Sequence, residues 1–268
     1  MMQMISLAAL TVLDAGPVGQ IRAAAEVGFD AVGLRLNPLL TSDPIVIGNS
    51  AREAEIKGLL SASGIGVLEI GVFPLRPETN IESLKPVIAF SATIRAKYLV
   101  CPVEDSNPLR RVETFSRMCE VARAFELSAL IEFNPYSACP DLHCGFDLVR
   151  SARQPNGAIC VDAFHLSRSG GHPDHLRGID PSLLPVVHFC DASHLPPTKR
   201  TKEELRAESR TARLLPGEGA LWLPEMLEVL PREIAISVEA PSAALASLPP
   251  SDRARLALEA TRRVLSVK

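Results

Sequence analysis

Short apolar runs rich in β-branched residues recur along the whole chain. Eight of them can be recognised, at residues 4–10, 31–37, 67–73, 98–103, 129–135, 158–164, 186–192 and 235–241. The segments between them, such as IRAAAEVGF and VETFSRMCEVARAFEL, repeat apolar residues at helical spacing, and a further one, RARLALEATRRVLSV, follows the last run. The runs are almost continuously apolar, which predicts strands covered by helices on one face and packed against an interior on the other.

Strands that alternate with helices in this way predict an α/β fold, a single (β/α)₈ TIM barrel. The alternative, a doubly wound open sheet, usually carries a glycine-rich phosphate loop after its first strand. Here the first run leads into TVLDAGPVGQ, which lacks G-x-G-x-x-G. We therefore expect one barrel domain over residues 1–268. The polar segment 194–219 follows the seventh run, and we expect it to form a loop over one mouth of the barrel.

Composition and charge restrict the partners. The formal net charge is −3, with 28 basic and 31 acidic residues spread along the chain, so no basic stripe is available for nucleic acid. No uncharged stretch approaches the roughly 18 to 20 residues that span a bilayer, and the first residues lack the pattern of a signal peptide. We expect a cytoplasmic protein with no membrane partner and leave open whether it forms a homo-oligomer.

The six cysteines show no C-x-x-C pair and mostly lie inside apolar runs. Unpaired cysteine is among the most often buried residue types, so the pattern predicts buried free thiols. Cys139 and Cys144 lie in a polar loop instead, where a thiol can be more reactive. Nothing in the sequence marks any of the six as a nucleophile.

Polar side chains end four of the predicted strands. In a barrel of this kind, active sites form at the carboxyl ends of the strands, so these side chains should meet at one mouth. Carboxylates inside apolar runs need a counter-charge, yet LIEF, CVDA and SVEA contain no lysine or arginine. One divalent cation would neutralise three carboxylates and accept a neutral imidazole, and this donor set favours Mn²⁺, Mg²⁺ or Co²⁺ while still allowing Zn²⁺. The predicted ligands are Glu132, Asp162, His188 and Glu239.

A different explanation of the same pattern stays open. Each of these carboxylates would then form a separate structural ion pair with an arginine or lysine from a neighbouring loop. The coincidence of four polar groups at one barrel mouth favours the metal site over this explanation.

Five motifs in this order, ALIEFNP, VDAFHLSRSGG, VVHFCDAS, RLLPGEG and SVEAP, resemble the xylose isomerase-like barrel family, often called sugar phosphate isomerases and epimerases. The resemblance runs from about the first strand to the end of the chain. It implies that one divalent metal is held by the four residues named above, that Glu132 and Glu239 shuttle protons, and that His165 contacts the substrate. It implies an isomerase or epimerase of a sugar-like or sugar-acid hydroxy-carbonyl compound, acting through a metal-stabilised enediolate.

Arginines near the predicted mouth bear on the substrate. Arg213, before LLPGEG, is similar to the family arginine that reaches into the site from the loop after the seventh strand. Arg35 ends the second strand and requires a partner, either the substrate or a nearby acid, and Arg76 shows the same ambiguity more weakly. With only 4% aromatic residues for stacking on a sugar, we expect a small polyhydroxylated substrate that carries an acid or phosphate group.

Two further acids lie in or next to the predicted strands. Asp191 is expected to orient a neighbouring group rather than to bind the metal. Glu69, in VLEIG, lies too early in its strand to be assigned to the site.

Three other functions are alternatives to an isomerase or epimerase. A metal-dependent dehydratase of the 3-dehydroshikimate or 2-keto-inositol kind uses the same barrel and ligands, although several such relatives have glutamine where this chain has His188. A DNA repair endonuclease shares the barrel but needs several metals and a basic surface, which this chain lacks. A non-catalytic metal-binding subunit also remains open. The isomerase or epimerase is the favoured hypothesis.

Overall fold

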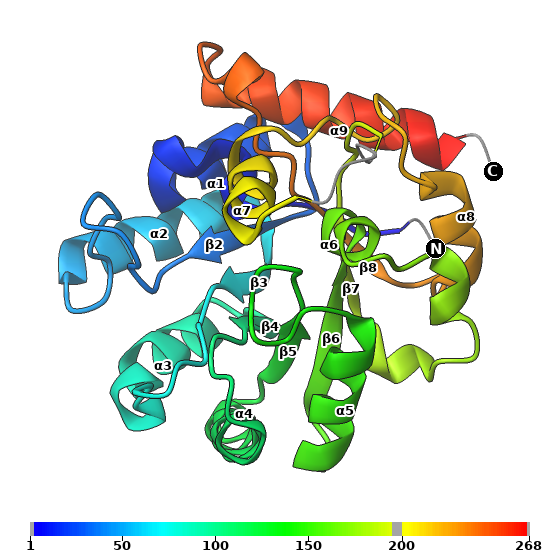
Figure 1. The fold of residues 1–268 in the computed structure, drawn as a ribbon. Helices are drawn as coiled ribbons and strands as arrows, with labels where there is room; N and C mark the ends of the chain where they lie inside the picture. The colour runs from blue at the N-terminus through cyan, green and yellow to red at the C-terminus, as the bar shows by residue number, and fades with distance from the viewer. Residues whose placement is uncertain (1–2, 195–199, 267–268) are drawn as a thin grey trace.

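A computed structural model describes residues 3–194 and 200–266. Within these residues, eight parallel strands pair in chain order and close into a barrel, with the last strand next to the first (Figure 1). The strands are β1 Ile5–Leu7, β2 Ala31–Arg35, β3 Gly66–Gly71, β4 Tyr98–Pro102, β5 Ser128–Glu132, β6 Gly157–Asp162, β7 Val186–Phe189 and β8 Ala235–Val238. Each lies within one of the eight apolar runs or overlaps it, so the predicted (β/α)₈ fold is confirmed.

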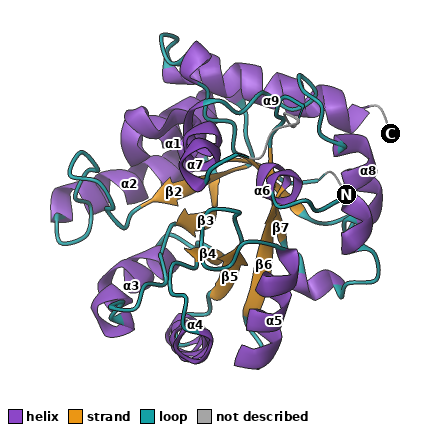
Figure 2. Ribbon diagram, in the orientation of Figure 1, coloured by secondary structure: helices purple, strands orange, loops and turns teal. Residues whose placement is uncertain are grey.

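Helices surround these strands (Figure 2). The α-helices are α1 Gly16–Val27, α2 Ser50–Ser63, α3 Lys85–Thr93, α4 Pro108–Arg123, α5 Leu142–Ala152, α6 Ala163–Arg168, α7 Lys202–Thr211, α8 Leu223–Val229 and α9 Pro250–Ser266. Short 3₁₀ helices cover Ala9–Ala15, Ile81–Leu84, Pro173–Leu176, Pro181–Leu183 and Ala243–Leu245. No helix in the described part of the chain is long and apolar enough to cross a membrane.

Local sequence explains where several helices begin and end. The side chains of Asn49 and Asn107 accept backbone N–H bonds at the first turns of α2 and α4, as asparagine does at helix N-termini. Gly28 and Gly64 end α1 and α2 in the left-handed conformation, at φ 90° and 70°, which glycine adopts without a steric penalty. These signals fix the lengths of the connections and therefore the positions at which the strands emerge.

The polar segment after β7 is partly helical, which corrects the expectation that residues 194–219 form only a loop. Thr201 and Glu204 form a reciprocal capping box that starts α7. Glu208 of α7 is buried and binds Arg168 of α6 at 2.7 Å. Residues 195–199 of this segment lie outside the described residues.

Apolar side chains fill both the barrel interior and the layer between strands and helices. The interior cluster contains Leu68, Leu130, Cys160 and Val186, together with small alanines. All six cysteines are free, and the four that lie outside the polar loop of Cys139 and Cys144 are buried, as predicted. Cys139 is buried as well, which corrects the expectation of a reactive thiol in a polar loop, whereas the neighbouring Cys139 thiol lowers the pKa of the partly exposed Cys144.

The pairing of β2 with β3 shifts by one residue in the middle of both strands. Val32 pairs with Val67, whereas the next residue, Gly33, pairs with Glu69, so Leu68 is extra in β3. A bulge of this kind redirects the side chains that follow it. Leu68 belongs to the interior cluster, and Glu69 is also buried, at 3% exposure.

Candidate metal centre

Four predicted ligands meet at the carboxyl ends of neighbouring strands. Glu132 ends β5, Asp162 ends β6, His188 lies in β7 and Glu239 directly follows β8. One donor atom from each lies within 4.8 Å of the donor atoms of the other three. The register explains part of this, because Asp162 pairs directly with His188. The structure therefore brings together the whole set that the sequence analysis selected.

The imidazole of His188 is the centre of the cluster. Its Nδ1 lies 2.8 Å from Glu132 Oε1, 3.5 Å from Glu239 Oε2 and 3.8 Å from Asp162 Oδ2. Its Nε2 points the other way and lies 3.2 Å from both carboxylate oxygens of Glu69. One ring nitrogen therefore faces the three predicted carboxylate ligands, and the other faces a fourth acid below them.

Burial and the neighbouring charges shift the pKa values of these groups in opposite directions. Burial raises the pKa of Glu239 to about 7, against the opposing effect of His188 and Arg213. Burial acts the same way on Asp162, but Arg213 and two histidines outweigh it and hold the pKa of Asp162 at about 2. Burial would lower the pKa of His188, yet the surrounding acidic groups raise it well above its usual value.

This donor set fits a divalent cation. Three carboxylates and one imidazole supply the oxygen and nitrogen ligands that Mn²⁺, Mg²⁺, Co²⁺ and Zn²⁺ accept. Four carboxylates, those of Glu69 and the three acidic ligands, surround one imidazole and one guanidinium, so a cation would offset their excess negative charge. The residues that would hold the ion are Glu132, Asp162, His188 and Glu239.

Arg213 lies inside the charge cluster. Its side chain is only 1% exposed, and its Nη1 donates to Asp162 Oδ2 at 2.6 Å. Its Nη2 lies 3.3 Å from Glu239 Oε2, and its Nε donates to the carbonyl oxygen of Ser209 at 2.8 Å. Asp162 thus forms a structural ion pair, which is the explanation that the sequence left open. It also belongs to the four convergent candidate ligands. A contact between Arg213 and the substrate stays a prediction.

His165 stands beside the cluster in the first turn of α6. Its backbone N–H donates to Asp162 Oδ1 at 2.8 Å, so the same aspartate caps the helix. Burial lowers the pKa of His165, against the attraction of Asp162. The ring Nε2 faces Arg213 at 3.4 Å, while the buried Nδ1 has no hydrogen-bond partner. A contact between His165 and the substrate stays a prediction.

Arg35 separates the metal centre from a larger cavity. A cavity of about 820 Å³ opens among residues after β1, β2 and β8, and none of the four candidate ligands lines it. Arg35 lines this cavity and also the small pocket beside His188 and Glu239. The Arg35 Nη1 lies 3.9 Å from Asp43 Oδ2, and its buried Nε has no partner. The guanidinium thus retains hydrogen-bonding capacity for a molecule in the cavity.

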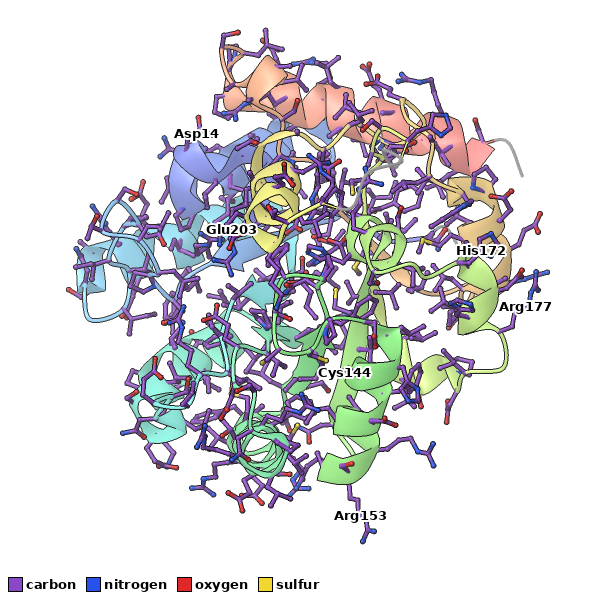
Figure 3. All side chains as sticks on the ribbon, in the orientation of Figure 1. Asp14, Cys144, Arg153, His172, Arg177 and Glu203 are labelled. Carbon is purple, nitrogen blue, oxygen red and sulfur yellow. The ribbon has the colours of Figure 1, made fainter. Side chains whose placement is uncertain are left out.

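Other charged residues near the mouth have protein partners. Asp14, labelled in Figure 3, lines the cavity and accepts two 2.7 Å bonds from Arg253. Arg76 pairs with Glu104 at 2.6 Å on the surface. Asp191 accepts the backbone N–H groups of Ala192, Gly217 and Leu221, and so orients the loop before α8, as expected.

Glu69 is the residue that the sequence analysis left out. Its position early in the strand argued against a role at the mouth, but the register shift in β3 places its carboxylate against His188. One feature of the sequence could have pointed to Glu69, because it is an acid in an otherwise apolar strand and a buried acid requires a partner. The identity of that partner depends on residues far away in the sequence.

The comparisons with known proteins agree with the fold. Residues 21–264 match the family described as "Xylose isomerase-like TIM barrel". The inosose isomerase of Bacillus subtilis (strain 168) is 22% identical over 167 residues, which cover 59% of this chain and 57% of that protein. The chain thus matches less than two thirds of the length of this curated relative.

Solved structures show the same architecture. The IOLI protein with a bound zinc atom superposes with a TM-score of 0.83 at 18% identity, covering 99% of each chain. The probable 3-DHS dehydratase AsbF of Bacillus anthracis gives a TM-score of 0.70 at 16% identity, covering 97% of this chain and 99% of that one. At such low identities, the solved structures show similarity of fold alone. The family model, by contrast, matches most of the chain. The protein belongs to the xylose isomerase-like TIM barrel family.

Proposed function

We propose that the protein is a divalent-metal-dependent isomerase or epimerase that acts on a sugar-like or sugar-acid hydroxy-carbonyl compound. The observation that carries the proposal is the convergence of four donor atoms within 4.8 Å of one another at the carboxyl ends of the strands. The name of the Bacillus subtilis relative, inosose isomerase, supports the same class of reaction. When bound, the metal supplies Lewis-acid stabilisation of negative charge that develops on the substrate oxygens.

The two glutamates perform the proton transfers in this proposal. Glu132 comes from β5 and Glu239 follows β8, so their carboxylates reach the site from different sides of the barrel. One carboxylate removes a proton from the carbon next to the carbonyl, which leaves an enediolate of the substrate. The other returns a proton to the adjacent carbon, or to the opposite face of the same carbon. The first outcome, with the hydroxyl proton passing to the former carbonyl oxygen, is isomerisation, and the second is epimerisation.

The substrate extends from the large cavity past Arg35 into the small pocket that His188 and Glu239 line. Arg35 lies where the cavity meets the small pocket, and its ion pair with Asp43 is a loose contact of 3.9 Å, so its guanidinium can bind an acid or phosphate group of the substrate. The unpartnered ring nitrogen of His165 is buried, so a substrate hydroxyl reaches it only after neighbouring side chains move. Arg35 in particular favours a polyhydroxylated substrate with an anionic end.

Turnover in D₂O tests this function. The purified protein, loaded with Mn²⁺, Co²⁺ or Zn²⁺, is incubated with keto-inositols, ketoses and keto sugar acids, and the products are followed by NMR. We expect an isomer of one substrate class, with deuterium at the carbon next to the carbonyl. Glu239→Gln should abolish the exchange, while Glu203→Gln, on the exposed face of α7, should leave it unchanged. Absence of exchange and of product with every substrate and metal would contradict the proposal.

The alternative is a metal-dependent dehydratase. The structural likeness to a probable 3-DHS dehydratase favours it, because the same barrel supports that reaction there. A dehydratase also removes the carbon-bound proton, but it then expels water and forms a conjugated enone. Growth of ultraviolet absorbance, with loss of one water from the product mass, would identify the dehydratase. An isomer of unchanged mass would identify the isomerase or epimerase.

A further inference from the structure

We infer that Glu69 is a positioning residue of the metal centre, which holds His188 so that its Nδ1 points at the ion. The inference rests on the proposed metal-dependent function. Glu69 lies below the four candidate ligands and does not bind the ion directly. The contacts on the two sides of the His188 ring support the inference.

The two nitrogens of His188 have separate partners. Nδ1 faces Glu132, Asp162 and Glu239, whereas Nε2 lies 3.2 Å from each oxygen of Glu69. A histidine binds a metal through an unprotonated nitrogen, so its remaining proton resides on the other nitrogen and needs an acceptor. Glu69 provides this acceptor and thereby selects the tautomer with a free Nδ1.

The surroundings hold Glu69 itself in place. Ser237 Oγ donates to Glu69 Oε1 at 2.6 Å, and Ser237 is the β8 residue that pairs with His188. On the other side, a Cβ on Gly33 would lie 2.6 Å from Glu69 Oε1 and 2.8 Å from its Cγ. Real Cβ atoms do not approach so closely, so the absence of a side chain at position 33 creates the space for the carboxylate.

Stability alone does not account for this arrangement. Glu69 is 3% exposed, and among the described residues its only ion-pair partner is His188. A buried acid with a single imidazole partner gains less than an apolar side chain of similar size would at the same position. The arrangement is explained if the carboxylate orients a ligand, because acids behind metal-bound histidines raise metal affinity.

Metal affinity measured by calorimetry tests the inference without reference to turnover. Metal-free protein is titrated with Mn²⁺ and separately with Zn²⁺, for the wild type, Glu69→Ala, Glu69→Gln and Gly33→Ala. Glu203→Gln serves as the control, because it changes an exposed glutamate of α7. Circular dichroism and the unfolding midpoint of each metal-free variant are recorded in parallel.

We expect the wild type and Glu203→Gln to bind one ion per chain with equal affinity. Glu69→Ala should bind about 10- to 100-fold more weakly. Glu69→Gln should lose less, because its amide oxygen still accepts the Nε2 proton. Gly33→Ala should also weaken binding, because it displaces Glu69 without removing a polar group. If Glu69→Ala does not fold, the Gln and Gly33 variants decide the question.

Three results would overturn the inference. They are equal affinity for the wild type and all Glu69 and Gly33 variants, equal losses in the Gln and Ala variants, and two ions per chain in the wild type. The last would indicate that Glu69, Cys160 and His188 hold an ion of their own. A wild type that binds no ion would instead reject the proposed function, so the two failures are distinguishable.

Discussion

Arg213 donates a 2.6 Å hydrogen bond to Asp162 from a position that is only 1% exposed. The protein therefore places a permanent positive charge among the candidate metal ligands. The cluster of three carboxylates is partly compensated by Arg213 and His188 before any ion binds. A divalent ion would then compete with a proton on His188 more than with the arginine, which stays fully charged.

Loss of Arg213 should destabilise the metal-free protein strongly. Removing one partner of a buried ion pair leaves an uncompensated charge, at a cost of about 3 to 5 kcal/mol. We expect Arg213→Ala to lower the free energy of unfolding by this amount in chemical denaturation of the metal-free protein, and metal ions to recover part of it. Arg76→Ala, which breaks an exposed pair with Glu104, should cost about 0 to 1 kcal/mol. Similar losses in the two variants would contradict the buried role of Arg213.

Metal binding should stabilise the fold. An ion at about 100 times its Kd adds about 2.7 kcal/mol to the free energy of unfolding. For a chain of 268 residues, the gain corresponds to a rise of about 5 °C in Tm. Differential scanning fluorimetry with a chelator and then with Mn²⁺ or Zn²⁺ measures it. Asp162→Asn should abolish the rise, and a variant that kept the full rise would exclude Asp162 as a ligand.

Glu132→Gln should remove turnover while the fold is retained. The substitution deletes a ligand charge and a proton-transfer group together, and general acid–base catalysis alone contributes about 100- to 10,000-fold. We expect kcat to fall by at least about 100-fold, measured at saturating metal to separate it from weaker metal binding. Circular dichroism checks the fold. Turnover close to that of the wild type would reject the assignment.

Arg35→Gln should discriminate between anionic and neutral substrates. A hydrogen bond to a charged group contributes about 1.5 to 3 kcal/mol, so KM for an anionic substrate should rise roughly 10- to 150-fold. KM for a neutral analogue should change little, because it lacks the acid group that Arg35 binds. Steady-state kinetics with a matched pair of substrates measures both values, with Arg76→Gln as a surface control. An equal effect on the two substrates would show that Arg35 does not recognise an anion.

The sequence predicted the fold and the four candidate ligands because both depend on local order. Apolar runs alternate with helical segments, and parallel strands of a barrel end at one mouth, so strand-end residues such as Glu132 and Glu239 must approach each other. Their separation along the chain does not matter, because each strand-and-helix unit returns the chain to the same side. The positions of these residues at the ends of predicted strands were therefore enough to predict that they meet.

The role of Glu69 and the protein partners of Arg213 were decided only by the tertiary structure. Glu69 faces His188 because of an extra residue in β3 and a missing side chain at Gly33, and neither strand alone indicates this pairing. The sequence placed Arg213 near the site by resemblance, but its ion pairs with Asp162 and Glu239 depend on the position of the preceding helix, which contacts α6. Local patterns determine which residues end a strand, whereas the direction of a side chain across the barrel depends on the register of neighbouring strands and on packing between distant segments.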